Sequence, residues 1–285
     1  MMTILFIGAN SNIGRSLVEK LKENFTVITA GRTNCDIQLD LQHPESIDFG
    51  HFQFDIVIHA AAHFGGKSIA NAAESATINT VSTIVLFEKA KASGATRFIY
   101  LSSLFTGING PSIWHNPYSI SKKHAEEWLL YLAQTHTMDL LILRPTMIYG
   151  DDLSFAKHQA MPYFFIDQAH QGIDIQLRGD GSANRNYLHI EDLVDIIDRC
   201  VDRNITGVHP CMHPEQTTIR QLAEIAALLP DSSVQVHLDK NQTNPESLDL
   251  TPEFLLYKNI DKTEFIPLAV GMKRIYTTNY HNSNG

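Results

Sequence analysis

Short apolar runs alternate with segments of helical periodicity along the first half of the chain. Apolar residues at i, i+3, i+4 and i+7 predict helices over 11–23 and 70–93, and a third helix that begins near Pro117. The apolar runs predict six strands, at residues 3–8, 25–30, 36–41, 54–62, 97–103 and 140–145. Because near-continuous apolar strands are typical of sheets covered on both faces, we expect an α/β fold with a doubly wound parallel sheet.

The regular alternation ends after residue 145, and the rest of the chain predicts a smaller lobe. We expect a first domain over 1–145 and a second lobe mainly over 146–285. A helix near 190–203 should pack back on the first domain, and since no linker-like segment separates the two parts, they should be intertwined. The other expected elements are two short strands within 175–190, helices over 217–230 and about 251–256, and a helix within 155–171 that starts or kinks at Pro162.

Composition narrows the classes of function. The chain has 285 residues and a formal net charge of −9, and an acidic protein is not expected to bind nucleic acids. Its three cysteines make no disulfide framework, which favours a reducing compartment. The N-terminus carries no basic segment, and its apolar run from Ile4 to Ile7 is too short for a signal peptide or a membrane span. We therefore expect a cytoplasmic protein without membrane contact.

A glycine-containing turn follows the first predicted strand and opens the first predicted helix. It reads Gly8-Ala9-Asn10-Ser11-Asn12-Ile13-Gly14. A turn at this place can bind the pyrophosphate of a dinucleotide on backbone N–H groups and the helix N-terminus. Gly8 would allow the tight turn, and Gly14 would allow the helix to pack closely on the strand. Two glycines also occur in ordinary strand–helix turns, so the place of the turn in the fold carries this prediction.

The end of the second predicted strand bears on the choice of cofactor. An acidic residue there would bond the 2′-hydroxyl of the adenosine ribose, but this chain has Gly31-Arg32. An arginine can pair with a 2′-phosphate, so NADP(H) is favoured over NAD(H). The alternative is an arginine that simply faces solvent after a strand.

The helix that begins after Asn116 carries a tyrosine and a lysine one turn apart. Asn116 and Pro117 are typical of an N-cap and a first helical turn. Tyr118 and Lys122 lie on one face, where an ammonium would lower the pKa of the phenol and suit it to proton transfer. With 9 tyrosines in the chain the pair alone is close to chance, and an exposed pair on a surface helix is the alternative.

Together these motifs resemble the extended short-chain dehydrogenase/reductase family of nucleotide-sugar epimerases, dehydratases and reductases. The resemblance covers nearly the whole chain. Gly8 and Gly14 match the family's G-x-x-G-x-x-G turn, with Ser11 in place of the middle glycine. The further matches, in chain order, are Asp40-Leu41, His59-Ala60-Ala61-Ala62, Asn79-Thr80-Val81, Ser102-Ser103, Tyr118 with Lys122, the segment 143–150, and the stretch 178–193, in which Arg185 matches and Asn186 replaces an aspartate.

The resemblance implies an NAD(P)-dependent enzyme with a Rossmann sheet and a substrate lobe. Tyr118 would be the acid or base on a substrate hydroxyl or ketone, Lys122 would lower its pKa, and Ser103 would bond the same oxygen. The cofactor would contact Gly8, Asn10, Ser11, Asn12, Ile13, Gly14, Arg32, Asp40, Leu41, Ala60, Ala61, Ala62, Asn79, Tyr118 and Lys122. A nucleotide-diphosphate sugar would contact Ser102, His115, Arg178 and Arg185.

Departures from the family pattern narrow the reaction. The 4,6-dehydratases carry an Asp-Glu pair after the catalytic hydroxyl, whereas Ser103 is followed by Leu104-Phe105-Thr106, so dehydration is not expected. The same segment has no cysteine for the epimerisation used by GDP-fucose-synthase-like enzymes. A 4-ketoreductase and a 4-epimerase remain. Arg32 favours the reductase, and the tail resembles a reductase segment except that Asn244 replaces an arginine.

Several alternatives stay open at this point. A non-catalytic dinucleotide-binding regulator could share the fold, and a family oxidoreductase could act on a ketone without a nucleotide. The loop between Ser103 and Tyr118 is shorter than is usual in the family, and its His115 is either a second acid/base or solvated. The segment 209–213 has metal-capable side chains, but no metal site is expected. A homodimer face, or simply core, is suggested by Ile84, Phe87, Trp128 and Tyr131.

Overall fold

The computed structural model describes residues 1–66, 68–251 and 253–280. Its main sheet has seven parallel strands in the order β11-β6-β5-β4-β1-β2-β3. The strands are β1 (Thr3–Ile7), β2 (Thr26–Gly31), β3 (Ile37–Gln38), β4 (Ile56–His59), β5 (Arg97–Leu101), β6 (Asp139–Pro145) and β11 (Gly207–Cys211). The order reverses direction between β1 and β4, which defines a doubly wound Rossmann sheet and confirms the predicted fold class.

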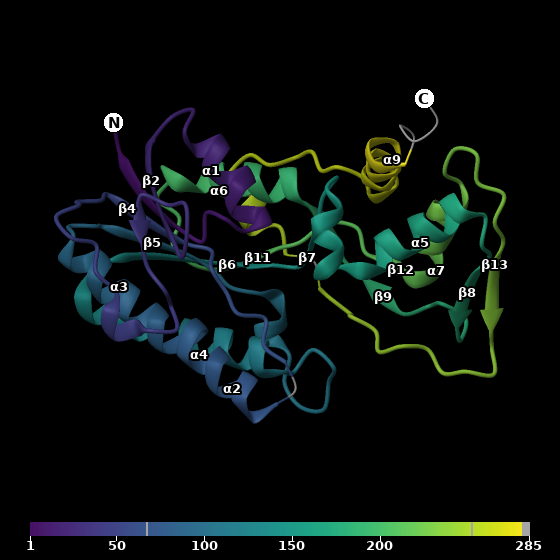
Figure 1. Cartoon of the computed structure of the whole chain (residues 1–285), viewed down its shortest axis with the longest axis horizontal. Helices are drawn as coiled ribbons and strands as arrows, with labels where there is room; N and C mark the ends of the chain where they lie inside the picture. Colours follow the sequence, from purple (N-terminus) through teal and green to yellow (C-terminus); the bar gives the residue numbers. More distant parts are fainter. Residues whose placement is uncertain (67, 252, 281–285) are drawn as a thin grey trace. The chain divides into compact units, whose positions relative to one another are not determined.

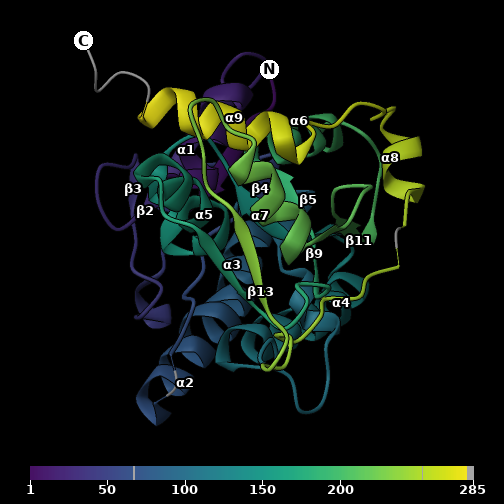
Figure 2. The same cartoon turned by 90° about the vertical axis from the view of Figure 1, so that its right-hand side faces the viewer.

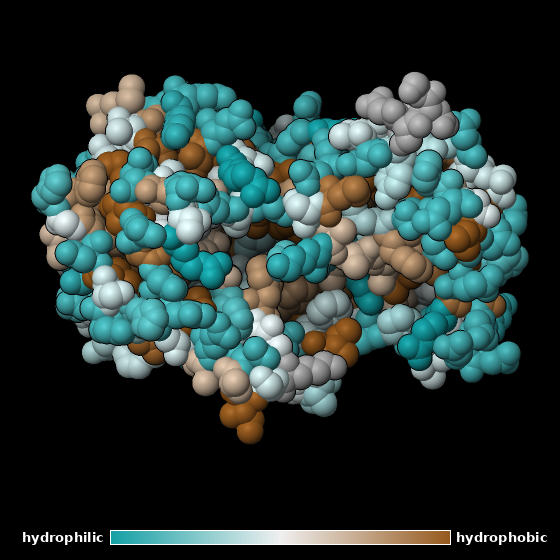
Figure 3. Space-filling model, in the orientation of Figure 1, coloured by the Kyte–Doolittle hydropathy of each residue, from teal (hydrophilic) through white to brown (hydrophobic). Residues whose placement is uncertain are grey.

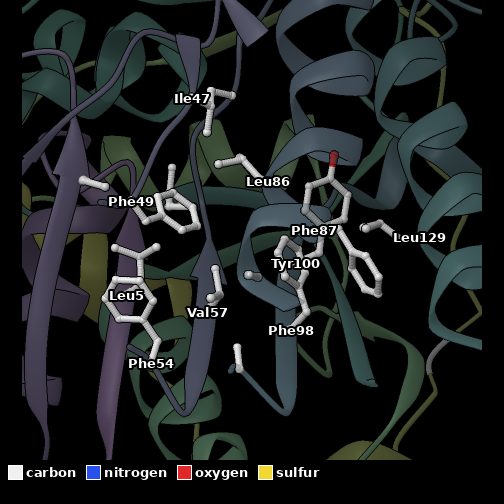
Figure 4. Close-up of a cluster of buried hydrophobic side chains, with 14 of the residues drawn as sticks. Leu5, Ile47, Phe49, Phe54, Val57, Leu86, Phe87, Phe98, Tyr100 and Leu129 are labelled. Carbon is white, nitrogen blue, oxygen red and sulfur yellow. The ribbon is translucent and has the colours of Figure 1, made fainter. Parts of the chain in front are cut away.

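Helices cover both faces of this sheet (Figures 1 and 2). On one face lie α2 (Ile69–Ser75), α3 (Ser82–Ala92) and α4 (Pro117–His136), and on the other lie α1 (Asn12–Leu21) and α6 (Ile190–Val201). Short helical turns occur at η1 (Pro44–Ser46) and η3 (Leu104–Gly107). The aromatic and aliphatic side chains between the sheet and α3 and α4 form a buried core, in which Phe87, Phe98 and Tyr100 lie together (Figure 4).

The helix predicted over 70–93 is interrupted. A π-helical segment, η2 (Ala76–Val81), separates α2 from α3, and such segments are frequent at functional sites. Within it Asn79 is only 1% exposed, and the Thr80 hydroxyl donates to the Ser121 carbonyl oxygen of α4 at 2.8 Å. The wider turn therefore faces polar side chains into unit 1, where a regular amphipathic helix would place apolar ones.

The chain forms two compact units. Unit 1 comprises Met1–Pro145 and Val194–Cys211, and unit 2 comprises Thr146–Leu193 and Met212–Gly285. Unit 1 thus includes most of α6 and the strand β11, which adds to the sheet beside β6. This seventh strand was not among the six predicted, because its sequence, Gly-Val-His-Pro-Cys, lacks a continuous apolar run.

Unit 2 contains three two-stranded pairings and four helices among its described residues. The strands are β7 (Met147–Tyr149), β8 (Ile175–Arg178), β9 (Asn184–Arg185), β10 (Tyr187–His189), β12 (Thr217–Thr218) and β13 (Val236–Asp239). The helices are α5 (Ala160–Gln171), α7 (Ile219–Ala227), α8 (Leu255–Asn259) and α9 (Leu268–Asn279), with the turn η4 (Leu153–Lys157). Pro162 lies in the first turn of α5, where its missing N–H costs no helical hydrogen bond.

Figure 3 shows one face of the surface. On the face drawn in Figure 3 hydrophilic residues predominate, and hydrophobic side chains gather only in small patches. Among the residues that the structure describes, no helix is both long and apolar enough to span a bilayer.

Candidate active site

The turn between β1 and α1 has the geometry of a dinucleotide cradle. Gly8 adopts φ +101°, and a Cβ there would lie 2.7 Å from the Ala61 backbone nitrogen, so both backbone shape and space require glycine. A Cβ on Gly14 would lie 2.2 Å from the Gly8 carbonyl oxygen. The turn is therefore packed tightly against the segment that follows β4, and α1 begins directly after it.

Side chains of the turn itself keep it in shape. Ser11, which replaces the middle glycine, caps α1: its hydroxyl accepts from the Gly14 N–H at 2.9 Å and donates to the Gly8 carbonyl at 2.9 Å. The Asn10 amide donates to the Thr33 carbonyl at 2.5 Å, and Asn12 accepts from Arg15. Ser11 thus supplies hydrogen bonds that a glycine would leave to the ligand or to water, and the turn is preformed.

The residues expected near the adenosine follow β2 and β3. The Arg32 side chain is exposed and makes no hydrogen bond or ion pair within the described part of the chain. Asp40 is half-buried and accepts from the Gln42 N–H at 3.0 Å, which leaves its second carboxylate oxygen without a bond from that turn. Leu41 is buried, and its carbonyl accepts from Ser82. These positions leave Arg32 available to an anion.

The segment after β4 is held by Asn79. Ala60, Ala61 and Ala62 are half-buried, and the Ala60 N–H donates to the Ile7 carbonyl, so the segment continues beside the glycine turn. The Asn79 side chain accepts from the His63 N–H at 2.8 Å and donates to the His63 carbonyl at 2.7 Å. Asn79 therefore fixes the backbone of this segment rather than leaving its amide for a ligand.

Ser103 and Tyr118 meet at the carboxyl end of β5. Tyr118 is the second residue of α4, which begins with an Asn116 capping box and Pro117. The Ser103 hydroxyl lies near the Tyr118 phenol and lowers the pKa of that phenol. Ser103 is 4% exposed, and its Oγ also accepts from the Phe105 N–H at 3.3 Å. The structure thus brings together the two hydroxyl groups that the sequence proposed for one substrate oxygen.

The pKa of Tyr118 differs from the sequence-based expectation. Burial raises it to about 12, and the nearby Ser103 hydroxyl opposes this rise only in part. Phe64 stacks on the ring, with centroids 4.9 Å apart and an interplanar angle of 20°, and covers one of its faces. The lysine does not lower the phenol pKa here, because its ammonium has other partners. Without further ligands Tyr118 is a protonated acid at neutral pH.

Lys122 is buried against β5 instead. It is 1% exposed, its Nζ donates to the Leu101 carbonyl at 2.7 Å, and it lies 4.4 Å from the centroid of the Tyr100 ring. Burial lowers the pKa of Lys122 to about 7, while Glu126 acts in the opposite direction. The nearby His59 is fully buried, and burial, assisted by Lys122, holds its pKa well below the usual value. His59 is therefore neutral.

The buried carboxylate of Glu126, which follows Tyr118 and Lys122 on α4, was not predicted from the sequence. Glu126 is 2% exposed and pairs with Arg144, whose Nε lies 2.9 Å from Glu126 Oε1. The Thr106 hydroxyl lies 3.1 Å from the same oxygen. The available signal in the sequence was the helical spacing, since Tyr118, Lys122 and Glu126 follow one another at intervals of four along one face of α4.

Ser102 and His115 have different surroundings. Ser102 is 5% exposed, and its Oγ has no hydrogen-bond partner within the described residues. His115 is exposed, and its Nδ1 lies 3.3 Å from the Ile108 carbonyl in the loop before α4. Next to it Trp114 stacks on Phe105 with centroids 4.9 Å apart. Ser102 is thus part of the packed strand end, whereas His115 faces solvent.

The two arginines expected at the substrate lie in unit 2. Arg178 is exposed at the end of β8. Arg185 is 3% exposed, and its Nη1 donates to the carbonyls of Asn184 and Glu246 at 2.6 and 2.8 Å. Asn244, in place of an arginine, accepts from the N–H groups of Asp180 and Gly181, both at 3.1 Å. Asn244 thus closes the turn after Arg178, and Arg185 is held by the backbone.

One cluster of unit 2 has metal-capable side chains. Asp151, His189 and Glu191 present ligand atoms within 4.8 Å of one another. Arg274 pairs with both carboxylates, and the His189 Nδ1 accepts from the Glu191 N–H at 3.2 Å. A guanidinium is therefore already paired with both carboxylates of the cluster, which joins α9 to β10 and the loop after β7. In the segment 209–213, His213 accepts from the Glu215 N–H.

Residues 4–211 match the sequence profile described as the NAD dependent epimerase/dehydratase family. Among curated relatives, a UDP-glucose 4-epimerase from Vibrio cholerae is 28% identical over 225 residues. That alignment spans 70% of this chain and 66% of the epimerase.

Solved structures share the fold over almost the whole chain. RMD from Pseudomonas aeruginosa complexed with NADPH superposes with a TM-score of 0.77 at 22% identity, covering 97% of this chain and 98% of that one. The UDP-glucose 4-epimerase of Thermus thermophilus in complex with NAD superposes with a TM-score of 0.75 at 18% identity, covering 96% and 97%. At these identities the likeness concerns the fold.

Proposed function

Because the chain belongs to the NAD dependent epimerase/dehydratase family, we propose that it is a sugar-nucleotide oxidoreductase with Tyr118 as its acid/base, and specifically an NADPH-dependent 4-ketoreductase. It is an NAD(P)-dependent enzyme of the extended short-chain dehydrogenase/reductase type. The observation that carries the proposal is the placement of the Ser103 hydroxyl near the Tyr118 phenol, on the helix that also carries the buried Lys122. A nicotinamide cofactor would supply the hydride, and the tight cradle at Gly8 and Gly14 fits its pyrophosphate.

Proton transfer would be the task of Tyr118. The phenol, whose pKa burial raises to about 12, is protonated at neutral pH and can donate to a carbonyl oxygen as that oxygen gains charge. Ser103 would donate a second hydrogen bond to the same oxygen, which stabilises the developing charge. A bound cofactor that accepts a hydrogen bond from the Lys122 ammonium would draw this positive charge nearer to the Tyr118 phenol. The pKa of Tyr118 would then fall. Reduction needs the acid form, which is the form favoured by this site.

NADP(H) is proposed as the cofactor on the strength of Arg32. Its exposed guanidinium follows the strand that ends beside the glycine turn, and β2 itself, Thr-Val-Ile-Thr-Ala-Gly, carries no acidic residue. An arginine in this place can pair with a 2′-phosphate. The family relatives are compatible with either cofactor, so the preference rests on Arg32 alone.

A nucleotide-diphosphate sugar is the proposed substrate, with Arg185 and Arg178 as diphosphate ligands. Arg185 is anchored by two backbone carbonyls, which restricts its side-chain freedom before any anion binds. A preorganised guanidinium loses less entropy on binding a diphosphate than a free one. Ser102 and His115 are proposed to contact the sugar, His115 because it is exposed in the loop that leads into α4.

The test is Tyr118→Phe, with Tyr131→Phe on the exposed face of the same helix as the control. Purified protein with NADPH is offered UDP-, dTDP- and GDP-linked 4-keto sugars, and the loss of absorbance at the nicotinamide band is followed. Tyr118→Phe should lower kcat at least about 100-fold, the usual contribution of a general acid, while NADPH binding stays within about 2-fold. Unchanged turnover in Tyr118→Phe would exclude the assignment.

A 4-epimerase is the second candidate, since the Vibrio cholerae relative bears that name. An epimerase regenerates its cofactor, so the corresponding 4-hydroxy sugar nucleotides would interconvert with no net change in NADPH. A reductase would instead oxidise one NADPH per product. The ratio of cofactor consumed to sugar converted therefore separates the two reactions.

We also propose a homodimer through the outer face of α4. Trp128 and Tyr131 are 49% and 58% exposed there and lie edge to face with centroids 6.3 Å apart. Phe87, in contrast, is 2% exposed and belongs to the core. Light scattering after size exclusion should give twice the monomer mass, and Trp128→Glu should return the monomer.

A further inference from the structure

The carboxylate of Glu126, one helical turn after Lys122, has no role in the reaction described so far. Glu126 follows Lys122 by one turn of α4 and is 2% exposed. A buried carboxylate is costly unless it is paired and hydrogen-bonded, and Glu126 is both. Arg144 of β6 holds it with Nε and Nη2, and Thr106 of η3 holds it with its hydroxyl. Two other elements of unit 1, β6 and η3, therefore fix this carboxylate of α4.

The position of Thr106 links the carboxylate to the catalytic serine. The Thr106 hydroxyl lies 2.8 Å from the Ser103 carbonyl, and its N–H donates to the same carbonyl at 3.1 Å. Glu126 is thus connected through one residue to the backbone of Ser103. It belongs at the same time to the helix that carries Tyr118 and Lys122.

Lys122 needs a negative neighbour more than an exposed lysine does. The titratable groups around its ammonium are Tyr100 and His59 from β5 and β4, and Tyr118 and Glu126 from its own helix. The Arg144 guanidinium of β6 is bonded to Glu126. Tyr100 is held neutral by a raised pKa, and His59 by a lowered one, in both cases mainly through burial. Glu126 is the anion among these groups, and it opposes the burial that lowers the pKa of Lys122 to about 7.

We infer that Glu126 is a positioning residue: its carboxylate, fixed by Arg144 and Thr106, keeps the Lys122 ammonium charged in a buried site. This inference rests on the proposed function, in which the charged Lys122 donates to the bound cofactor beside Tyr118. Glu126 acts through Lys122 and contacts no substrate. With this arrangement Lys122 stays protonated below neutral pH although it is buried.

The test follows the charge of Lys122 directly and needs no substrate. Lysine labelled with ¹³C at Cε is titrated by NMR in the full chain, and the Lys122 resonance is identified by its absence in Lys122→Arg. Glu126→Gln should lower the titration midpoint of Lys122 by about one unit from its value near 7, since it removes an opposite charge. Glu127→Gln, the exposed neighbour, is the matched control and should leave the midpoint unchanged.

The direction of the shift separates this role from a structural one. If Glu126→Gln merely loosened the site, water would enter and the Lys122 midpoint would rise toward the value of 10.5 for a free lysine. A rise, or a midpoint equal to that of Glu127→Gln, overturns the inference. If Glu126→Gln does not fold, Glu126→Gln with Arg144→Gln leaves no unpaired charge. It should show a smaller fall in the same direction, because the guanidinium's positive charge is lost together with the carboxylate, and a rise would overturn the inference here too. Loss of turnover in Tyr118→Phe tests the proposed function separately.

Discussion

Phe64 lies flat against the ring of Tyr118, with centroids 4.9 Å apart and planes inclined by 20°. Phe64 comes from the segment after β4, is 53% exposed, and stacks on the proposed acid/base. An offset stack of this kind contributes about 0.5–1.5 kcal/mol beyond the area it buries. We expect a double-mutant cycle of Phe64→Ala and Tyr118→Ala to give a coupling free energy in that range, measured by urea unfolding.

Tyr131→Ala on the exposed face of the same helix is the control partner for that cycle. It shares no contact with Phe64, so the effects of Phe64→Ala and Tyr131→Ala on the free energy of unfolding should add within about 0.5 kcal/mol. Additivity for Phe64 and Tyr118 as well would show that the stack contributes nothing to stability.

Lys122 makes the stability of the protein depend on pH. Burial lowers its pKa to about 7, so between about pH 7 and 10.4 the unfolded chain binds a proton at this position that the folded chain does not. The free energy of unfolding should therefore rise with pH through this window, and the cost of burying the charge is fully present below it. Lys122→Met should be more stable than the natural chain at pH 6 by at least about 2 kcal/mol, and the difference should shrink at pH 9.

Lys123→Met provides the comparison for this titration. Lys123 follows directly on α4, but its ammonium donates to Asn109 in an exposed hydrogen bond. Urea unfolding at pH 6 and pH 9 should show a nearly constant difference for Lys123→Met. A constant difference for Lys122→Met too would mean that Lys122 keeps an ordinary pKa in the folded chain.

Local signals explain what the sequence could predict. Asn116 and Pro117 mark the start of α4, and the apolar run Ile4–Ile7 marks a strand, because capping and strand burial depend on neighbouring residues. The doubly wound sheet follows from the order of such signals. The strand β11 is different, since Gly207 and Pro210 weaken its own pattern and it forms by pairing with β6.

Long-range pairing explains what the sequence could not predict. Glu126 and Glu127 are adjacent and alike, and only the approach of Arg144 from β6 and Thr106 from η3 makes the first a buried anion. The pKa of Tyr118 was expected to fall because Lys122 lies one turn away. It rises because burial outweighs a charge that is turned toward Leu101.

Arg32 offers a test of cofactor choice. Arg32→Asp should raise the dissociation constant for NADPH at least about 10-fold, because a carboxylate repels the 2′-phosphate that the guanidinium would pair with. NADH has a ribose hydroxyl there and should bind as well as before or better. Quenching or enhancement of the nicotinamide fluorescence measures both. Lys22, an exposed cation at the end of α1, provides the control, and Lys22→Ala should change neither affinity. Equal losses of affinity for NADPH and NADH in Arg32→Asp would contradict the proposed contact.

Gly14→Ala separates helix propensity from packing in the dinucleotide cradle. Inside a helix alanine is normally favoured over glycine by about 1 kcal/mol, so propensity alone predicts a more stable protein. The new Cβ would however lie 2.2 Å from the Gly8 carbonyl oxygen, which is backbone and cannot rotate away. We expect the clash to prevail, with a loss of about 1–3 kcal/mol in the free energy of unfolding and weaker NADPH binding. Gly107→Ala is the control, because its Cβ would meet no atom within 4 Å, and it should leave the free energy of unfolding and NADPH binding nearly unchanged. If Gly14→Ala is as stable as Gly107→Ala, the turn can move away from α1.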